Sequence, residues 1–293
     1  MKLAIIDKKD MTLKIEQSCL KFEEQSIPFR LIDMLILNHR TTFVAKDILR
    51  LTKENISILL ISHNSSNFSI INSANAKNSE IKLAQYRSLE QRLAFAKYFL
   101  THKLTLHQEH LKSFGIQGEI SKELQQVEDA SAVEELLGIE GSYARAYFAH
   151  YFAHLPKTMH KGCRSRKPPR DPVNALLSYW YSLYYHIITA KLLSHGFEPS
   201  LGYLHTPFRS HNALSSDILE LFRSSINQAV ASVFHHNILQ VEDFSKKGGV
   251  YLRFEGRKRV WGEFSALVEL LKPKLDKEIA NLKKAIHETD TSH

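Results

Sequence analysis

Cysteine and glycine are both scarce in this chain of 293 residues, and each shortage excludes something. The two cysteines, Cys19 and Cys163, are too few for a disulfide scaffold, and their spacing matches no zinc ribbon or redox pair. We therefore expect ordinary thiols in a reducing compartment. All eleven glycines lie between Gly115 and Gly262, so that Asn, Asp, Ser and Lys have to form the earlier turns.

Several common signatures are also missing. The chain has no G-x-x-x-x-G-K phosphate loop, no G-x-G-x-x-G dinucleotide fingerprint and no G-x-S-x-G elbow of serine hydrolases. Only residues 3–6 are apolar near the start, whereas an export signal needs about 7–15 such residues. The uncharged run from Pro172 to Ala190 contains four tyrosines, which suits a buried helix better than a membrane span. We therefore expect a cytoplasmic protein without a membrane partner.

What is present is the composition of a folded protein, with 43% hydrophobic and 24% charged residues. A net charge of +8 favours an acidic partner such as nucleic acid. Part of the positive charge is concentrated in residues 157–170, which contain no Asp or Glu. The basic residues of this segment are Lys157, Lys161, Arg164, Arg166, Lys167 and Arg170. Such a segment attracts phosphate, although a solvated loop explains its charge equally well.

Hydrophobic periodicity divides the chain into two parts, as expected at about 100–200 residues per domain. Short apolar or alternating runs predict strands at 3–6, 13–16, 20–23, 35–37, 56–61 and 68–71, the first three as successive hairpins. Thr42 can cap a short helix that ends at Leu51. Helical spacing predicts long helices over 80–112, 132–154, 171–195, 216–236 and 258–286.

These patterns predict an α+β protein. A small N-terminal β-rich domain occupies residues 1–73, and a polar linker follows at 74–79. A larger, all-helical C-terminal domain occupies residues 80–293 and carries the candidate catalytic residues.

The segment Gly138-Ile139-Glu140-Gly141 places an acid between two glycines inside a helical pattern. A glycine in a helix interior costs about 1 kcal/mol relative to alanine, so the pair needs an explanation. Glycines allow a phosphate, a metal ion or another backbone to approach the helix closely. The alternative is a helix end, with a glycine cap and Glu140 in water.

Two further segments supply possible metal ligands. Asp217 and Glu220 stand three residues apart, which on a helix places their side chains about 5–6 Å apart on nearly the same face. The segment Gly202-Tyr203-Leu204-His205 adds an imidazole. Together with Glu140 these groups form a set of three carboxylates and one imidazole, which suits Mg²⁺ or Mn²⁺. The alternative is a pair of acids on a solvated helix face.

Five segments, taken in order, carry a family resemblance. They are Lys82–Arg87, Gly138–Arg145, Arg166–Tyr179, Gly202–His205 and Asp217–Arg223. In this order and at this spacing they resemble the CRISPR-associated integrase family, the first-numbered Cas protein, which inserts new spacers into CRISPR arrays. The sequence departs from the family's D-L-M-E-P-F-R-P pattern at Leu221 and Ser224, where prolines are common, and has Glu220 where Asp is frequent.

The resemblance implies roles for individual residues. Glu140, His205 and Glu220 would be catalytic metal ligands for Mg²⁺ or Mn²⁺, and Asp217 would support them from one helical turn away. A further group of basic residues would bind DNA, namely Arg145, Arg164, Arg166, Lys167, Arg170 and Arg223.

It also implies a reaction and partners. The 3′-hydroxyl of an incoming DNA end would attack a phosphodiester of the array, and a divalent ion would activate that hydroxyl and stabilise the leaving oxygen. With water as the attacking group, the same site would act as an endonuclease on branched DNA. The implied partners are double-stranded and branched DNA, a second copy of the chain held through the β-rich domain, and a bridging dimer of the small second-numbered Cas protein.

Two other functions stay open at this point. A catalytically inactive DNA-binding scaffold of the same fold would have lost a ligand, whereas Glu140, His205 and Glu220 are all able to bind a metal ion. A manganese-dependent, structure-specific nuclease outside CRISPR would cut RNA hairpins and would be indifferent to branched DNA.

Overall fold

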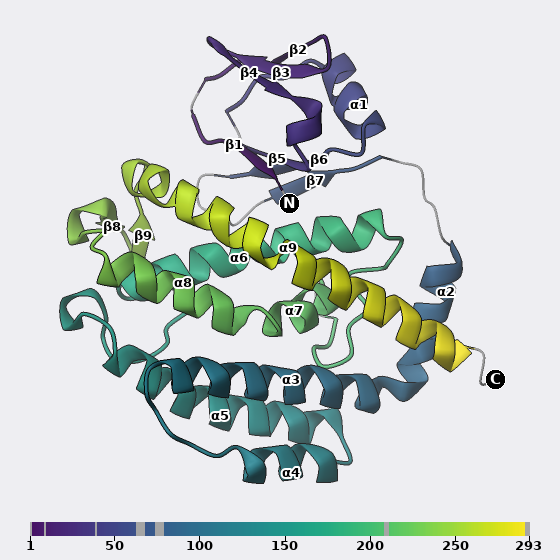
Figure 1. Ribbon diagram of the computed structural model, residues 1–293, viewed down its shortest axis with the longest axis vertical. Helices are drawn as coiled ribbons and strands as arrows, with labels where there is room; N and C mark the ends of the chain where they lie inside the picture. Colours follow the sequence, from purple (N-terminus) through teal and green to yellow (C-terminus); the bar gives the residue numbers. More distant parts are fainter. Residues whose placement is uncertain are drawn as a thin grey trace.

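The computed structural model describes residues 2–8, 10–38, 40–62, 68–73, 79–207 and 211–290. Of the linker predicted at 74–79, residues 74–78 therefore lie outside the described residues. Figure 1 shows the strands of the N-terminal part above a larger group of helices. The predicted α+β architecture, with a β-rich N-terminal part and a helical C-terminal part, is confirmed. Contrary to the prediction, the C-terminal part is not all-helical, because two short strands at Phe244–Lys246 and Val250–Leu252 pair within it.

Two small sheets form the N-terminal part. The larger one contains, in order across the sheet, β1 (Leu3–Ile6), β5 (Met34–Asn38), β6 (Ser57–Ile61) and β7 (Phe68–Ile71). Its first three strands run parallel, and β7 runs antiparallel to β6. The smaller sheet is an antiparallel meander of β2 (Lys14–Glu16), β3 (Cys19–Phe22) and β4 (Gln25–Pro28). A short 3₁₀ turn (Phe29–Leu31) leads to β5, and α1 (Ala45–Lys53) lies between β5 and β6.

The first strand does not pair as predicted. We expected residues 3–6, 13–16 and 20–23 to form successive hairpins, and only the second and third segments do so. β1 pairs in parallel with β5 instead, with Leu3 opposite Met34. The alternation of apolar residues identifies a strand but not its partner, and a parallel partner always lies beyond a long connection.

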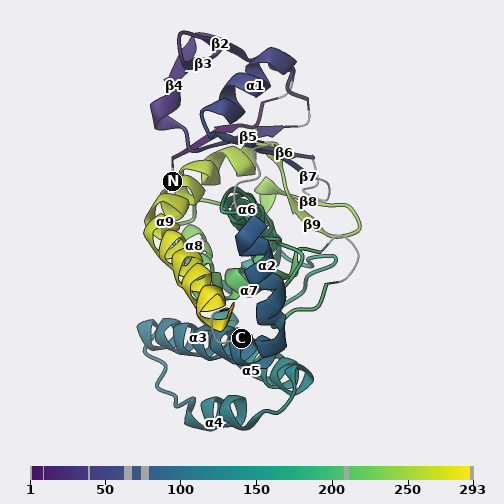
Figure 2. The same cartoon turned by 90° about the vertical axis from the view of Figure 1, so that its right-hand side faces the viewer.

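The central strands of the larger sheet, β5 and β6, are buried on both faces, as parallel strands covered on both sides usually are. Leu35 and Ile58 face a core that is shared with Leu51 of α1. Ile36 and Leu59 point to the opposite face and join the core of the helices. Figure 2 shows this sheet between α1 with the smaller sheet on one side and the helices on the other. The sheet therefore ties the two parts of the chain together.

The helical part is built around α6, and its elements have the following bounds. They are α2 (Ser79–Ser88), α3 (Arg92–Ser113), α4 (Ser121–Asp129), α5 (Val133–Ala153), α6 (Pro172–Ser194), α7 (Ala213–Glu220), α8 (Arg223–His235), β8 (Phe244–Lys246), β9 (Val250–Leu252) and α9 (Phe254–Asp290). Short 3₁₀ turns occur at Leu89–Gln91, Lys157–Met159 and Val241–Asp243. α9 crosses the helical part and packs along α2 near the end of the chain (Figure 1).

α6 shows why the uncharged run 172–190 is a core helix. Asp171 caps its first turn by accepting a hydrogen bond from the backbone N–H of Asn174 at 2.8 Å, and Pro172 occupies the first turn. Trp180 and Tyr184 are fully buried, and the helix packs against α7, α8 and α9. In the described part of the chain, no helix combines the length and apolarity that a membrane span requires.

His186 of α6 makes folding sensitive to acid. Its ring lies 3.5 Å from the ring of Phe68 on β7, measured between centroids, and burial lowers the pKa of His186 to about 3. Below its ordinary pKa of about 6.5 the unfolded chain binds a proton that the folded chain does not bind, so stability falls with pH from about 6.5 towards 3. We expect His186→Phe to remove about 1.4 kcal/mol per pH unit from the slope of the unfolding free energy between pH 6 and 4.

Urea unfolding at several pH values measures this slope. Phenylalanine keeps the ring contact with Phe68, so the variant is expected to fold. His150→Phe on the exposed face of α5 is the matched control and is expected to leave the slope unchanged. If the unfolding free energies of wild type and His186→Phe change in parallel with pH, buried His186 is not the source of the acid sensitivity.

Candidate active site

Two of the predicted ligands meet at a buried lysine. The ammonium of Lys103 on α3 forms ion pairs with Oε1 of Glu140 on α5 and, at 2.6 Å, with Oε2 of Glu220 at the end of α7. Lys103 and Glu220 are only 2% and 3% exposed, whereas the Glu140 side chain retains 22% of its exposure. The structure therefore brings together two carboxylates that lie far apart in the sequence.

Asp217 holds the imidazole beside these carboxylates. Its buried carboxylate accepts hydrogen bonds from the backbone N–H groups of Tyr203 at 2.6 Å, Leu204 at 3.2 Å and His205 at 2.9 Å. It also lies 2.7 Å from Nδ1 of His205. Because a carboxylate can only accept, this contact places the ring proton on Nδ1 and leaves Nε2 with a lone pair. Nε2 lies 3.9 Å from Oε1 of Glu220.

Gly202 allows this loop to approach α7 so closely. A Cβ at position 202 would lie 2.7 Å from the backbone of Ala213 and 2.9 Å from Oδ2 of Asp217. No side chain fits there, so a glycine is required for Asp217 to reach the three successive N–H groups.

The glycines around Glu140 have a different setting. Gly138 and Gly141 lie inside α5, so the alternative of a helix end is wrong. A Cβ at either position would meet no atom within 4 Å, and both positions are exposed. The surface of α5 beside Glu140 is therefore free of side chains at these two positions.

Two cations keep Glu220 ionised in its buried position. Burial disfavours the charged carboxylate, but Arg223 and Lys103 outweigh this effect and hold the pKa of Glu220 well below its ordinary value. Nε of Arg223 lies 2.8 Å from Oε2 of Glu220, and its guanidinium stacks over the ring of Tyr181. With an uncharged imidazole, the three carboxylates and two cations leave this cluster with one net negative charge.

The donor atoms suit a divalent cation, although one feature stands in the way. Within the described residues no three His, Cys, Asp or Glu side chains are arranged to hold a metal ion as they stand. The ammonium of Lys103 contacts the two carboxylates that would otherwise share the metal. Two carboxylates and an imidazole lone pair remain an appropriate set for Mg²⁺ or Mn²⁺, and the two carboxylates already contact a cation.

Comparison with known proteins decides the family. The family model described as CRISPR associated protein Cas1 matches residues 2–266. The chain belongs to the Cas1 family. A CRISPR-associated endonuclease Cas1 of Thermodesulfovibrio yellowstonii is 26% identical over 292 residues, covering 92% of each chain. One from Thermus thermophilus is 28% identical over 267 residues, covering 89% of this chain and 80% of that protein.

Solved structures show the same fold. A Cas1 protein from Thermotoga maritima superimposes with a TM-score of 0.88 at 19% identity, covering 98% of this chain and 97% of the other. A casposase bound to an integration product gives a TM-score of 0.86 at 21% identity, covering 100% of this chain and 92% of the other. The part of the chain that matches the Cas1 family contains all four predicted site residues, Glu140, His205, Asp217 and Glu220.

The basic residues of this Cas1-family chain divide into internal and exposed ones. Arg164 donates to Oδ1 of Asn174 at 2.8 Å and to Oγ of Ser178 at 3.1 Å, and burial lowers its pKa to about 10. Arg223 is likewise engaged, with Glu220. Both therefore make internal contacts, and the DNA-binding role that the family resemblance implies for them stays a prediction. The remaining predicted residues are exposed, namely Arg145, Arg166, Lys167 and Arg170.

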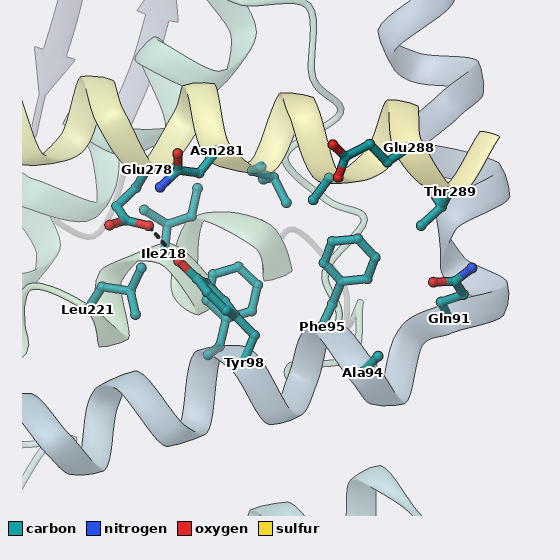
Figure 3. A pocket seen from close by; sticks show the side chains of 13 residues that line it. Gln91, Ala94, Phe95, Tyr98, Ile218, Leu221, Glu278, Asn281, Glu288 and Thr289 are labelled. Carbon is teal, nitrogen blue, oxygen red and sulfur yellow. Dashed lines mark hydrogen bonds between the residues drawn. The ribbon is translucent and has the colours of Figure 1, made fainter. Parts of the chain in front are cut away.

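A cavity near the site contains none of the predicted ligands in its walls. About 590 Å³ of space opens between α3 and α9, with Phe95 and Tyr98 on one wall and Glu278 and Asn281 on the other (Figure 3). The hydroxyl of Tyr98 donates to Glu278 across it at 2.9 Å. Since no predicted ligand lines this cavity, the candidate site is the charged cluster around Lys103 rather than the cavity.

Lys103 is the residue that sequence reasoning missed. It occupies the buried face of α3 between Phe99 and His107, at a spacing of four residues on either side. A charged residue on the apolar face of a long helix is the signal that could have revealed it, because buried charges are paired.

Proposed function

We propose that this chain is a divalent-metal-dependent DNA integrase and endonuclease that inserts spacer DNA into CRISPR arrays by attack of a 3′-hydroxyl on a phosphodiester. The observation that carries the proposal is the convergence of Glu140, Glu220 and the oriented His205 in one charged cluster. Membership of a family whose relatives are named endonucleases supports it, as does the shared fold of a casposase bound to an integration product.

In this proposal each residue has a definite task. Glu140, Glu220 and Nε2 of His205 would hold Mg²⁺ or Mn²⁺, which supplies activation of the attacking hydroxyl and charge stabilisation at the leaving oxygen. Asp217 fixes the tautomer and the orientation of His205. Arg223 keeps Glu220 ionised in the interior. The exposed glycines of α5 leave room for a DNA backbone beside Glu140.

The proposed partners are DNA, a second copy of the chain and a second CRISPR protein. Neighbours of the same fold include a complex named Cas6-RT-Cas1–Cas2 and a Cas1–DNA complex. By analogy we propose that this chain binds double-stranded and branched DNA, dimerises through its β-rich part and is bridged by a Cas2 dimer.

Strand transfer tests the proposed function. A duplex with free 3′-hydroxyls is incubated with a plasmid-borne array, with Mg²⁺ or Mn²⁺ and with the Cas2 partner, and wild type is compared with Glu140→Ala. We expect integration by wild type alone. Equal integration by both proteins would eliminate the site, and DNA binding without integration by either would favour the inactive scaffold.

The exposed arginines and lysine of the segment 166–170 set the salt dependence of DNA binding. Arg166, Lys167 and Arg170 line a pocket of about 380 Å³ on the surface of this segment. Each neutralised phosphate contributes about −0.9 to the slope of log K against log salt on duplex DNA. Replacing all three by alanine is therefore expected to make the slope less steep by about 2.7.

Fluorescence anisotropy with a labelled duplex at several salt concentrations measures this slope. The double variant Lys46→Ala/Lys53→Ala, in the exposed part of α1, is the control and is expected to keep the wild-type slope. An unchanged slope in the triple variant would show that this segment does not contact phosphates.

A further inference from the structure

Lys103 is an unusual neighbour for two metal-binding carboxylates. Its ammonium is buried and contacts both Glu140 and Glu220. A lysine in such a place is costly to bury unless it is fully paired, and these two carboxylates pair it. The same two carboxylates are the oxygen ligands of the proposed metal, so Lys103 and a metal ion compete for the same negative charge.

The two carboxylates hold Lys103 unequally. Glu220 is 3% exposed and is also paired with Arg223, so its position is fixed from two sides. Its second oxygen, Oε1, lies 3.9 Å from Nε2 of His205. Glu140 is more exposed, and within the described residues Lys103 is the one group in ion-pair contact with it. The contact between Lys103 and Glu140 is therefore the one that a metal ion can replace.

A second acceptor for the ammonium lies one helical turn away. His107 follows Lys103 by four residues on the same buried face of α3, and its ring stacks on Tyr147 with 4.0 Å between centroids. Both of its ring nitrogens are buried without a hydrogen-bond partner in the described part of the chain. Burial, followed by the charge of Lys103, holds the pKa of His107 well below its ordinary value. A neutral imidazole can accept a hydrogen bond from an ammonium group.

We propose that Lys103 is the built-in cation of the metal-free site, and that a divalent metal displaces its ammonium from Glu140 towards His107. This inference rests on the proposed function, because it takes Glu140 and Glu220 as metal ligands. Lys103 is then a positioning residue: it keeps two carboxylates together before the metal arrives, and it lowers the affinity of the site for the metal.

Binding of Mn²⁺ to the metal-free protein, without DNA, tests the inference. Free Mn²⁺ is measured by electron paramagnetic resonance during titration of wild type, Lys103→Met, Lys103→Arg and the control Lys112→Met, which alters an exposed lysine of the same helix. We expect Lys103→Met to bind Mn²⁺ at least about fivefold more tightly, the lower end of the usual range of coupling between two bound groups. Lys103→Arg, which retains the charge, and Lys112→Met are expected to resemble wild type.

Thermal melting supplies a second readout. In EDTA, Lys103→Met is expected to melt at a lower temperature than wild type, because two buried carboxylates lose their shared cation. Mn²⁺ is expected to raise its melting temperature by more than that of wild type. If Lys103→Met does not fold, Lys103→Gln can donate to a carboxylate and is expected to show the same changes to a smaller degree.

The role of His107 is tested in the same titration. His107→Phe retains the stacking on Tyr147 but removes the acceptor. We expect it to weaken Mn²⁺ binding when Lys103 is present and to have no effect in Lys103→Met.

Two outcomes separate this inference from the proposed function. If Glu140→Gln abolishes Mn²⁺ binding while Lys103→Met binds no more tightly than wild type, the inference is overturned and the metal site stands. If Glu140→Gln leaves Mn²⁺ binding unchanged, the proposed metal site itself is wrong.

Discussion

Replacement of Asp217 by asparagine is expected to weaken Mn²⁺ binding and strand transfer by about 10–100-fold. Asparagine has one acceptor oxygen where the carboxylate accepts from three backbone N–H groups and from Nδ1 of His205. The NH₂ group of asparagine is a donor, and beside Nδ1 of His205 it favours an imidazole that accepts at Nδ1. The ring proton of His205 then moves to Nε2. That nitrogen then lacks the lone pair that a metal needs.

The same substitution is expected to lower the free energy of unfolding by about 3 kcal/mol or more, because a fully buried, charged hydrogen-bond network is broken. Mn²⁺ titration and urea unfolding measure the two effects separately. Asp243→Asn is the matched control, since Asp243 is also buried and accepts from Gln240 and Arg259, away from the site. It is expected to lose stability alone. Wild-type Mn²⁺ affinity in Asp217→Asn would contradict the role given to Asp217.

Replacement of Glu220 by glutamine is expected to reduce strand transfer by about 100-fold to 1,000-fold, the usual loss on removing one preorganised electrostatic group from an active site. Glutamine has nearly the same shape but cannot balance Lys103 and Arg223, which both contact Oε2 of Glu220. The proposed metal also loses one of its two charged ligands. DNA affinity is expected to stay at the wild-type level or rise slightly, because a negative charge near the phosphates is removed.

Integration assays and anisotropy with the same duplex measure these two quantities. Glu278→Gln, on α9 in the cavity of Figure 3, is the matched control and is expected to integrate normally. Circular dichroism shows whether Glu220→Gln is folded. Integration by Glu220→Gln at the wild-type rate would mean that this carboxylate does not take part in the reaction.

The sequence reveals where the strands and helices lie better than how they pair. Residues 68–71 coincide with β7, and 171–195 contains α6, because both patterns are strong and locally bounded. The parallel pairing of β1 with β5 depends on residues far away in the chain, which periodicity does not contain. β8 and β9 have three residues each and are too short to show a pattern. α4 contains only two apolar residues, Leu124 and Val127, which are too few to show a helical period.

Two predicted long helices are interrupted. The helix predicted over 80–112 is divided by the 3₁₀ turn Leu89–Gln91, and the second interruption matters for the site. The helix predicted over 216–236 ends at Glu220 and resumes at Arg223. Leu221 and Phe222 are buried at the break, and the backbone oxygen of Leu221 accepts a hydrogen bond from Lys274 at 3.0 Å. This tertiary hydrogen bond comes from α9, so local sequence cannot predict it.

The candidate site could be predicted only in part, for a physical reason. Carboxylates and imidazoles can be recognised in a sequence as possible metal ligands, and Glu140, His205 and Glu220 do lie together in the structure. Lys103 did not stand out, because an isolated lysine in a helix is ordinarily solvated. Its burial results from the packing of α3 against α5 and α7, which no single segment encodes.

The position of a bound manganese ion tests the central claim most directly. Crystals of the full chain, soaked in Mn²⁺ and measured at the manganese absorption edge, locate the ion by anomalous scattering. We predict one strong peak within about 2.5 Å of a carboxylate oxygen of Glu140, a carboxylate oxygen of Glu220 and Nε2 of His205. A peak bound by other residues, with Glu140 and Glu220 still paired with Lys103, would contradict the account.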